Sequence, residues 1–175
     1  MARSTFVHVD LDIHRELLVS INVEYMSWIS SELHKSSALT AADLNSMPVS
    51  DYVEQGIDKL CGQISPWGAF YLVEYDGKIA GMGGLRWISE GLAEIKRMYV
   101  RPAHRGKGLG KAIIERLLED AMRFGYRIVV LDSAPFMQVA QQLYQEVGFA
   151  YRPPYAQTEV PPELHLVWRF MEQGF

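Results

Sequence analysis

The clearest chemical signal in this 175-residue sequence is a short stretch of glycine and basic residues. Residues 105–111 read Arg-Gly-Lys-Gly-Leu-Gly-Lys, and a helical apolar pattern follows at once. The first backbone N–H groups of a helix that begins here have no partner within the helix, and with the helix dipole they form an anion site. The glycines let the backbone approach the anion, and the cations add positive charge. The stretch therefore predicts a site for phosphate or pyrophosphate.

Two common phosphate-binding motifs do not match this stretch. The phosphate loop of nucleoside triphosphatases needs four residues between its first glycine and Gly-Lys, and then Ser or Thr. Here Gly106 and Gly110 are separated by three residues, and Ala112 follows Lys111. The dinucleotide fingerprint needs its glycines spaced G-x-G-x-x-G directly after a strand. Here the third glycine comes one residue early, and several residues intervene after Val100.

The elements that must position this turn begin with a strand, two helices and a three-stranded meander. Residues 4–10 predict a short strand. Asp12 can cap a long helix, whose apolar pattern ends near residues 34–37. The apolar positions of this helix are Leu17, Leu18, Ile21, Tyr25, Trp28 and Ile29. A loop over 36–50 and a helix over 51–61 follow. Strands are predicted at 69–75, 79–87 and 92–100, with a hairpin turn at Asp76-Gly77 and a further turn at 89–91.

The second half alternates helices and strands. A helix is expected over 108–124, ended by Gly125, and its inward face is Leu109, Ile113, Leu117 and Ala121. Residues 128–131 are a fully apolar run, typical of a buried parallel strand. A helix over 135–146 and a last strand over 164–170 complete the chain. This order predicts an α/β fold, with a mixed central sheet and helices on both faces, as a single domain over residues 1–175.

Composition and residue patterns argue against several classes of protein. A net charge of −4 and a pI near 5.7 argue against nucleic acid as the main partner. No apolar run is long enough to cross a membrane, and the N-terminus lacks a signal peptide, so we expect a cytoplasmic protein without a membrane partner. One cysteine, Cys61, excludes an intramolecular disulfide. The histidines show no spacing that suggests a metal site.

The turn and its surroundings resemble a known superfamily. Arg105-x-x-Gly108-x-Gly110 is similar to the Arg/Gln-x-x-Gly-x-Gly/Ala signature of the GCN5-related N-acetyltransferases (GNAT). Residues 94–102 look like the fourth strand of that family, and residues 140–149 look like its late helix with the usual tyrosine, Tyr144. The resemblance is clearest over residues 70–149.

The resemblance implies a GNAT-like fold whose fourth and fifth strands splay apart, with acetyl-CoA as cosubstrate and no metal. Pantetheine would lie in the gap, pyrophosphate on the turn, and the acetyl carbonyl would accept a hydrogen bond from strand-four N–H groups. The implied acetyl-CoA-binding residues are Met98, Tyr99, Val100, Arg105, Gly106, Lys107, Gly108, Leu109, Gly110 and Lys111.

An amine that attacks a thioester must first lose its proton, because alkylammonium groups have a pKa near ~10.4. Glu94 is the candidate base: its spacing from Arg105 resembles that of family members, and on a regular strand it shares a face with Met98 and Val100. We expect burial to raise its pKa. An equally good interpretation is that Glu94 is a solvated strand residue or an ion-pair partner of Lys96 or Arg97. The alternative bases are Glu24, Glu32 and Asp132, or bulk water acting on an amine of low pKa.

The family pattern implies that Tyr144 protonates the departing thiolate, and core packing is the alternative role for this side chain. Cys61 lies away from the site, so we expect direct attack without a covalent enzyme intermediate. Aromatic residues near the gap, namely Tyr25, Trp28 and Tyr155, suit a cationic amine of a small molecule. Two alternatives stay open: acetylation of a protein or peptide at a lysine or N-terminus, and a non-catalytic acyl-CoA-binding regulatory domain. Homodimer formation also stays open.

Overall fold

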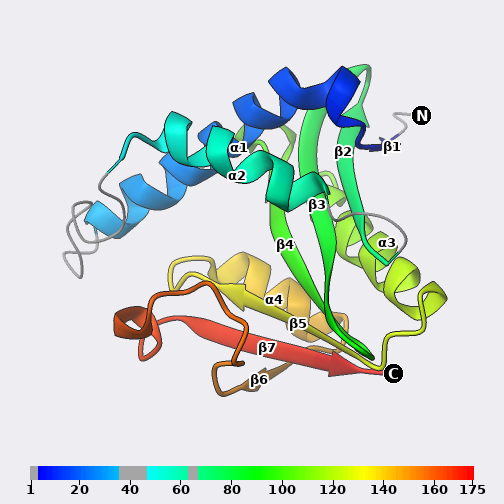
Figure 1. Ribbon diagram of the computed structural model, residues 1–175, viewed down its shortest axis with the longest axis vertical. Coiled ribbons are helices and arrows are strands. Elements are labelled where there is room, and N and C mark those ends of the chain that lie inside the picture. Colours follow the sequence, from blue (N-terminus) through cyan, green and yellow to red (C-terminus); the bar gives the residue numbers. More distant parts are fainter. Residues whose placement is uncertain (1–3, 36–46, 63–66) are drawn as a thin grey trace.

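The computed structural model of the protein describes residues 4–35, 47–62 and 67–175. It contains a seven-stranded sheet in the order β1-β2-β3-β4-β5-β7-β6 (Figure 1). The strands are β1 (Ser4–His8), β2 (Ala69–Tyr75), β3 (Lys78–Ser89), β4 (Leu92–Val100), β5 (Ile128–Ser133), β6 (Ala150–Arg152) and β7 (Arg169–Gly174). The helices are α1 (Leu11–Lys35), α2 (Val49–Gly62), α3 (Leu109–Arg123) and α4 (Gln138–Glu146), with 3₁₀ turns η2 (Pro102–His104) and η3 (Pro162–Leu164).

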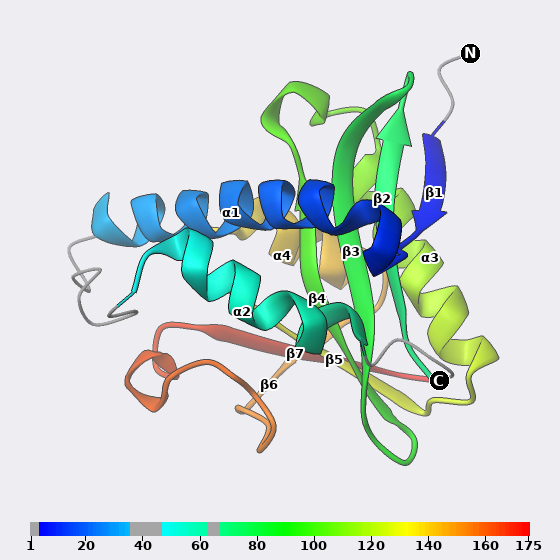
Figure 2. The ribbon, with the colours of Figure 1, turned by 45° about the horizontal axis from the view of Figure 1, so that its top comes forward.

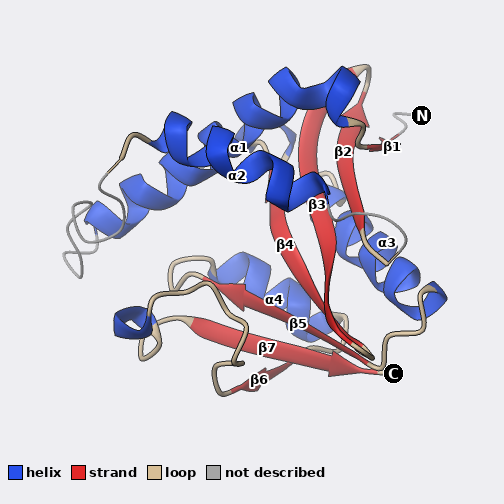
Figure 3. Cartoon of the chain, in the orientation of Figure 1, coloured by secondary structure: helices blue, strands red, loops and turns tan. Residues whose placement is uncertain are grey.

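The sheet separates two apolar cores. Figures 2 and 3 show, from two directions, the helices that cover the two faces of the sheet. On one face, α1 and α2 bury side chains such as Leu18 and Ile57 against Leu72. On the other face, α3 and α4 pack residues such as Leu117 and Tyr144 against β4 and β5. The predicted α/β class, with helices on both faces of a mixed sheet, is confirmed.

Glycines in β3 allow both layers to approach the sheet closely. A Cβ at Gly83 would lie 2.6 Å from Ile113 Cγ2 of α3, and a Cβ at Gly84 would lie 2.4 Å from the ring of Phe70. Real Cβ atoms do not make such contacts, so any side chain there would push a helix or a ring away. The small residues of β3 therefore fix how near α3 lies to β4.

The gap in the sheet lies between β4 and β5. The two strands run parallel but pair at only three positions, Leu92 with Ile128, Ala93 with Val129 and Glu94 with Val130. Beyond Glu94 the strands diverge, and Figure 1 shows β1–β4 and β5–β7 as two arms of an open angle. The predicted splay of the fourth and fifth strands is confirmed.

Several local expectations need correction. The carboxylate of Asp10, not of Asp12, caps α1 by accepting the Asp12 N–H at 2.9 Å. Leu17 is 46% exposed and does not belong to the core. The last strand begins at Arg169, because Pro162 starts a 3₁₀ turn in which Leu164 O accepts from Val167 and Trp168. The short strand β6 was not expected. Most of the predicted loop over 36–50 lies outside the described residues, and α2 starts two residues before Asp51.

Candidate active site

A β-bulge in β4 sets the direction of the side chains at the gap. Tyr99 pairs with Met82 and Lys96 with Gly84, so Arg97 and Met98 together face the single residue Gly83. Arg97 has φ +56°, a conformation that costs a non-glycine residue about 1–2 kcal/mol. The bulge reverses the alternation of faces along the strand.

This reversal overturns the expectation that Glu94 shares a face with Met98 and Val100. Met98 and Val100 pack in the α3 core together with Ala93 and Ile95. Glu94 therefore points to the other face. The bulge does orient the backbone usefully, since Arg101 N–H donates to Ala80 O of β3 at 2.8 Å. Alternation then directs the N–H groups of Val100 and Met98 away from β3, into the gap.

A cavity of about 640 Å³ occupies the gap between β4, α3 and α4. Every residue predicted to bind acetyl-CoA lines it except Lys107, whose ammonium lies 4.6 Å from the ring centre of Tyr75. His104 also lines it with a buried Nδ1 that has no hydrogen-bond partner among the described residues.

The turn before α3 has the geometry of an anion site. Gly106 and Gly108 have φ +74° and +76°, and a Cβ at either position would meet nothing within 4 Å. Their conformation, rather than crowding, requires glycine. Gly108 caps α3 without a side-chain bond, so the N–H groups of the first turn stay available. Arg105 holds the turn against β4 by donating from Nε to Val100 O at 3.1 Å.

Tyr144 reaches the same cavity from α4. Its side chain is buried, and the structure records no hydrogen bond of its hydroxyl with the described residues. Burial raises the pKa of Tyr144 above its usual range, with smaller contributions from Tyr25 and Asp132. The phenol therefore keeps its proton at neutral pH.

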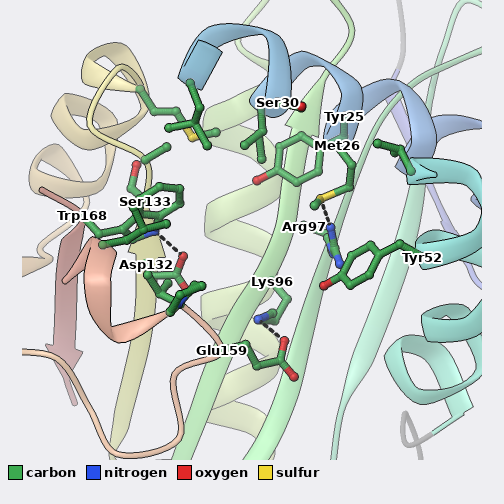
Figure 4. A pocket seen from close by; sticks show the side chains of 18 of the residues that line it. Tyr25, Met26, Ser30, Tyr52, Lys96, Arg97, Asp132, Ser133, Glu159 and Trp168 are labelled. Carbon is green, nitrogen blue, oxygen red and sulfur yellow. Dashed lines mark hydrogen bonds and ion pairs between the residues drawn. The ribbon is translucent and has the colours of Figure 1, made fainter. Parts of the chain in front are cut away.

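A second cavity of about 310 Å³ meets the first one at the splay (Figure 4). It lies between α1, β4, β5 and the loop that ends in η3. Five residues line both cavities: Tyr25, Ile95, Arg97, Asp132 and Met137. Burial raises the pKa of Tyr25 to about 12, while Arg97 lowers it and Asp132 raises it. Both charges thus act on the Tyr25 hydroxyl where the cavities meet.

Among the candidate bases, Asp132 is the one that lines the cavities. It stands at the C-terminal end of β5 and accepts hydrogen bonds from Trp168 Nε1 at 2.8 Å and from the Tyr155 hydroxyl at 3.3 Å. Glu24 instead binds Tyr99 and Arg101, and Glu32 binds Lys35; neither glutamate lines either cavity. A carboxylate that ends a buried parallel strand is a sequence signal that could have drawn more attention to Asp132.

Glu94 is fully buried and lines neither cavity. Its carboxylate is held by Arg86, whose Nε lies 2.9 Å away, and by Lys96 at 3.7 Å. The Tyr155 hydroxyl lies 2.5 Å from Glu94 Oε1 and also contacts Asp132. Glu94 is therefore connected to the cavities through Lys96, which lines the smaller one, and through the Tyr155 hydroxyl, which contacts Asp132. Ion pairing with Lys96 is present, and the described residues show none with Arg97.

The other predicted residues differ in their relation to the two cavities. Tyr25 lines both. Trp28 lines only the larger cavity, with the Arg105 guanidinium 5.0 Å from its ring centre. Tyr155 lines neither. Cys61 is buried in α2, and burial raises the pKa of its thiol to about 12. Within the described residues, no three metal-binding side chains cluster, and no helix is long and apolar enough to cross a membrane.

Comparison with known proteins now identifies the family. Residues 38–149 match the model of the Acetyltransferase (GNAT) family. The chain belongs to this family. Its fold resembles that of yncA from Salmonella typhimurium, solved with acetyl-CoA, at a TM-score of 0.64 and 22% identity, covering 98% of this chain and 94% of yncA.

Two relatives share only part of their length with this GNAT protein. The uncharacterized N-acetyltransferase YjgM of Escherichia coli K12 is 34% identical over 89 residues, which are 49% of this chain and 53% of YjgM. The N-acetylaspartate synthetase of Rattus norvegicus is 36% identical over 87 residues, which are 49% of this chain and 29% of that protein. The chain thus spans about half the length of YjgM and less of the synthetase.

Proposed function

We propose that this protein transfers the acetyl group of acetyl-CoA to the amine of a small molecule. The observation that carries the proposal is the meeting of two cavities at the β4–β5 splay, with Asp132 on one side and Tyr144 on the other. Family membership supports the class of reaction.

The residues of the larger cavity fit acetyl-CoA. The turn with Gly106 and Gly108 offers unpaired N–H groups and nearby cations to the pyrophosphate. The gap beside β4 would take the pantetheine arm. The N–H groups of Met98 and Val100, which face the gap, would bind the acetyl oxygen and stabilise the negative charge that develops there.

Two side chains, one as acceptor and one as donor, would transfer protons in this reaction. Asp132 would accept the proton of the acceptor ammonium, directly or through a water. Trp168 and Tyr155 hold its carboxylate in place. Glu94, the base predicted from the sequence, would not contact the acceptor. It would influence Asp132 through the Tyr155 hydroxyl, which contacts both carboxylates. Tyr144, which stays protonated and has no competing hydrogen-bond partner among the described residues, would donate to the departing thiolate.

The smaller cavity favours a small acceptor over a protein. The loop before β7, with Val160, Pro161 and Leu164, forms one wall of it. A peptide substrate would need an open groove at this place. The name of the rat relative, N-acetylaspartate synthetase, likewise points to a small product.

An acceptor screen tests the proposal. Acetyl-CoA is incubated with simple amines, amino acids, aminoglycosides and peptides, and the released CoA thiol is measured. We expect turnover with at least one class of small amine and much less with peptides. Acetyl-CoA binding by calorimetry without thiol release from any amine would instead establish a non-catalytic acyl-CoA-binding domain.

A further inference from the structure

Arg97 is a cation without a carboxylate partner among the described residues. It lines both cavities, yet among the described residues its guanidinium makes one hydrogen bond, from Nη1 to the thioether sulfur of Met26. Its Nε is buried and has no hydrogen-bond partner within the same described ranges. A thioether is a weak acceptor, so most of the hydrogen-bonding capacity of this guanidinium is unused. The bulge holds Arg97 here in a strained conformation.

The neighbouring cations differ from Arg97 in this respect. Lys96, the residue before it, binds Glu159 at 2.8 Å. Arg86 binds both Glu94 and Glu159, and Arg101 binds Glu24 at 2.9 Å. These side chains are neutralised by the protein itself, so Arg97 is the cation of the smaller cavity that, among the described residues, remains available to a ligand.

The lining of the smaller cavity is largely apolar, but it also includes the acidic side chain of Asp132. Figure 4 shows Arg97 beside Tyr52 on one side and Asp132 beside Trp168 on the other. Arg97 lowers the pKa of the Tyr25 hydroxyl and Asp132 raises it. The cavity thus presents a positive group and a negative group to one occupant, and a guanidinium binds a carboxylate through two parallel hydrogen bonds.

We propose that Arg97 binds a carboxylate of the acceptor, so that the acceptor is an amino acid or another amino-carboxylic acid. The ammonium of such a molecule lies toward Asp132 and its carboxylate toward Arg97. This inference rests on the proposed function, because it concerns the acceptor of the same reaction.

Matched acceptor pairs test the inference on the wild-type protein. Each amino acid in the screen is compared with its carboxamide and with the amine that lacks the carboxyl group. We expect kcat/KM to be tenfold to a hundredfold higher for the free carboxylate. Equal rates within each pair would refute the role of Arg97 and leave the acetyltransferase proposal intact, whereas no thiol release from any amine would refute the acetyltransferase proposal itself.

Arg97 variants test the residue. In Arg97→Gln the preference for the carboxylate should fall to near one, mainly through a higher KM, while acetyl-CoA affinity by calorimetry stays unchanged. Arg97→Lys should restore part of the preference. The control is Arg15→Gln, which removes an exposed arginine paired with Asp58 on the α1–α2 surface and should keep the full preference. An unchanged preference in folded Arg97→Gln would overturn the proposal.

Discussion

Tyr144 combines a buried ring with a hydroxyl that no described residue engages. Tyr144→Phe should keep the packing against Phe149 and lose the proton donor. We expect kcat to fall by about tenfold to a thousandfold, the usual contribution of general acid catalysis, with acetyl-CoA affinity unchanged. Steady-state kinetics and calorimetry measure the two quantities. Tyr151→Phe, on an exposed tyrosine, is the control, and wild-type turnover in Tyr144→Phe would leave Tyr144 only a packing role.

Asp132 and Glu94 make separable predictions about the amine proton. Asp132→Asn should depress kcat/KM most at low pH, where neutral amine is scarce, and the rate should recover as the pH rises toward the pKa of the amine. The ratio of variant to wild-type rate across pH is the measurement. A ratio that does not change with pH would remove Asp132 from proton transfer.

Glu94→Gln tests the base predicted from the sequence in the same assay. Its position behind Tyr155 predicts a smaller loss at low pH than in Asp132→Asn. Removing the charge also weakens the buried pair with Arg86, which should lower the free energy of unfolding by about 1–3 kcal/mol. Denaturant unfolding measures that cost. A pH profile as steep as that of Asp132→Asn would show that Glu94 takes the proton itself.

At the scale of elements, the N-terminus of α3 should depend on the conformation of Gly108. In Gly108→Val the added Cβ meets no atom within 4 Å, but φ +76° disfavours valine and the turn must move. We expect loss of acetyl-CoA binding in a folded protein, measured by calorimetry and thermal unfolding. Gly125→Val imposes similar strain at the other end of α3, at φ +81°, and should leave binding intact. Unchanged affinity in Gly108→Val would contradict the site.

The sequence predicted those elements that local residue chemistry determines. Asp76-Gly77 and Gly91 adopt the positive φ that their turns require, and the turn before α3 lines the larger cavity as expected. No residue type near Arg97 predicts the bulge, because arginine does not favour positive φ. The pairing of β4 with β3 imposes this conformation. The prediction that Glu94 shares a face with Met98 and Val100 was therefore wrong. The last strand was misplaced because its apolar residues Leu164 and Trp168 belong to a turn begun by Pro162.

At the scale of the whole molecule, Glu159 joins the two arms of the sheet. From the loop between β6 and β7 it binds Lys59 of α2, Arg86 of β3 and Lys96 of β4 at 3.3, 3.0 and 2.8 Å. Burial raises its pKa, but Lys96, Arg86 and Lys59 outweigh burial and lower the pKa to about 2. A depressed folded-state pKa gives stability that is present above the unfolded value of 4.5 and is lost as the pH falls toward 2.

Glu159→Gln should therefore be less stable than the wild type at pH 7, and the difference should shrink as the pH falls from 4.5 toward 2, because the wild-type carboxylate becomes protonated over this range. Denaturant unfolding at a series of pH values measures the difference. Glu163→Gln, an exposed position in the same loop, is the control and should follow the wild type throughout. A stability difference between Glu159→Gln and wild type that stays constant with pH would mean that the carboxylate charge contributes nothing.

The meeting of two cavities at one splay has a kinetic consequence. Under the proposed function each substrate would have its own compartment, so neither would have to leave before the other enters, and both would be bound when the acetyl group moves. Double-reciprocal plots at several fixed amine concentrations should intersect, and free CoA should compete with acetyl-CoA but not with the amine. Cys61, buried in α2 with a thiol pKa of about 12, offers no acetyl carrier that would uncouple the two half-reactions. Parallel lines would mean that the acetyl group is held covalently by the enzyme after CoA leaves and before the amine binds.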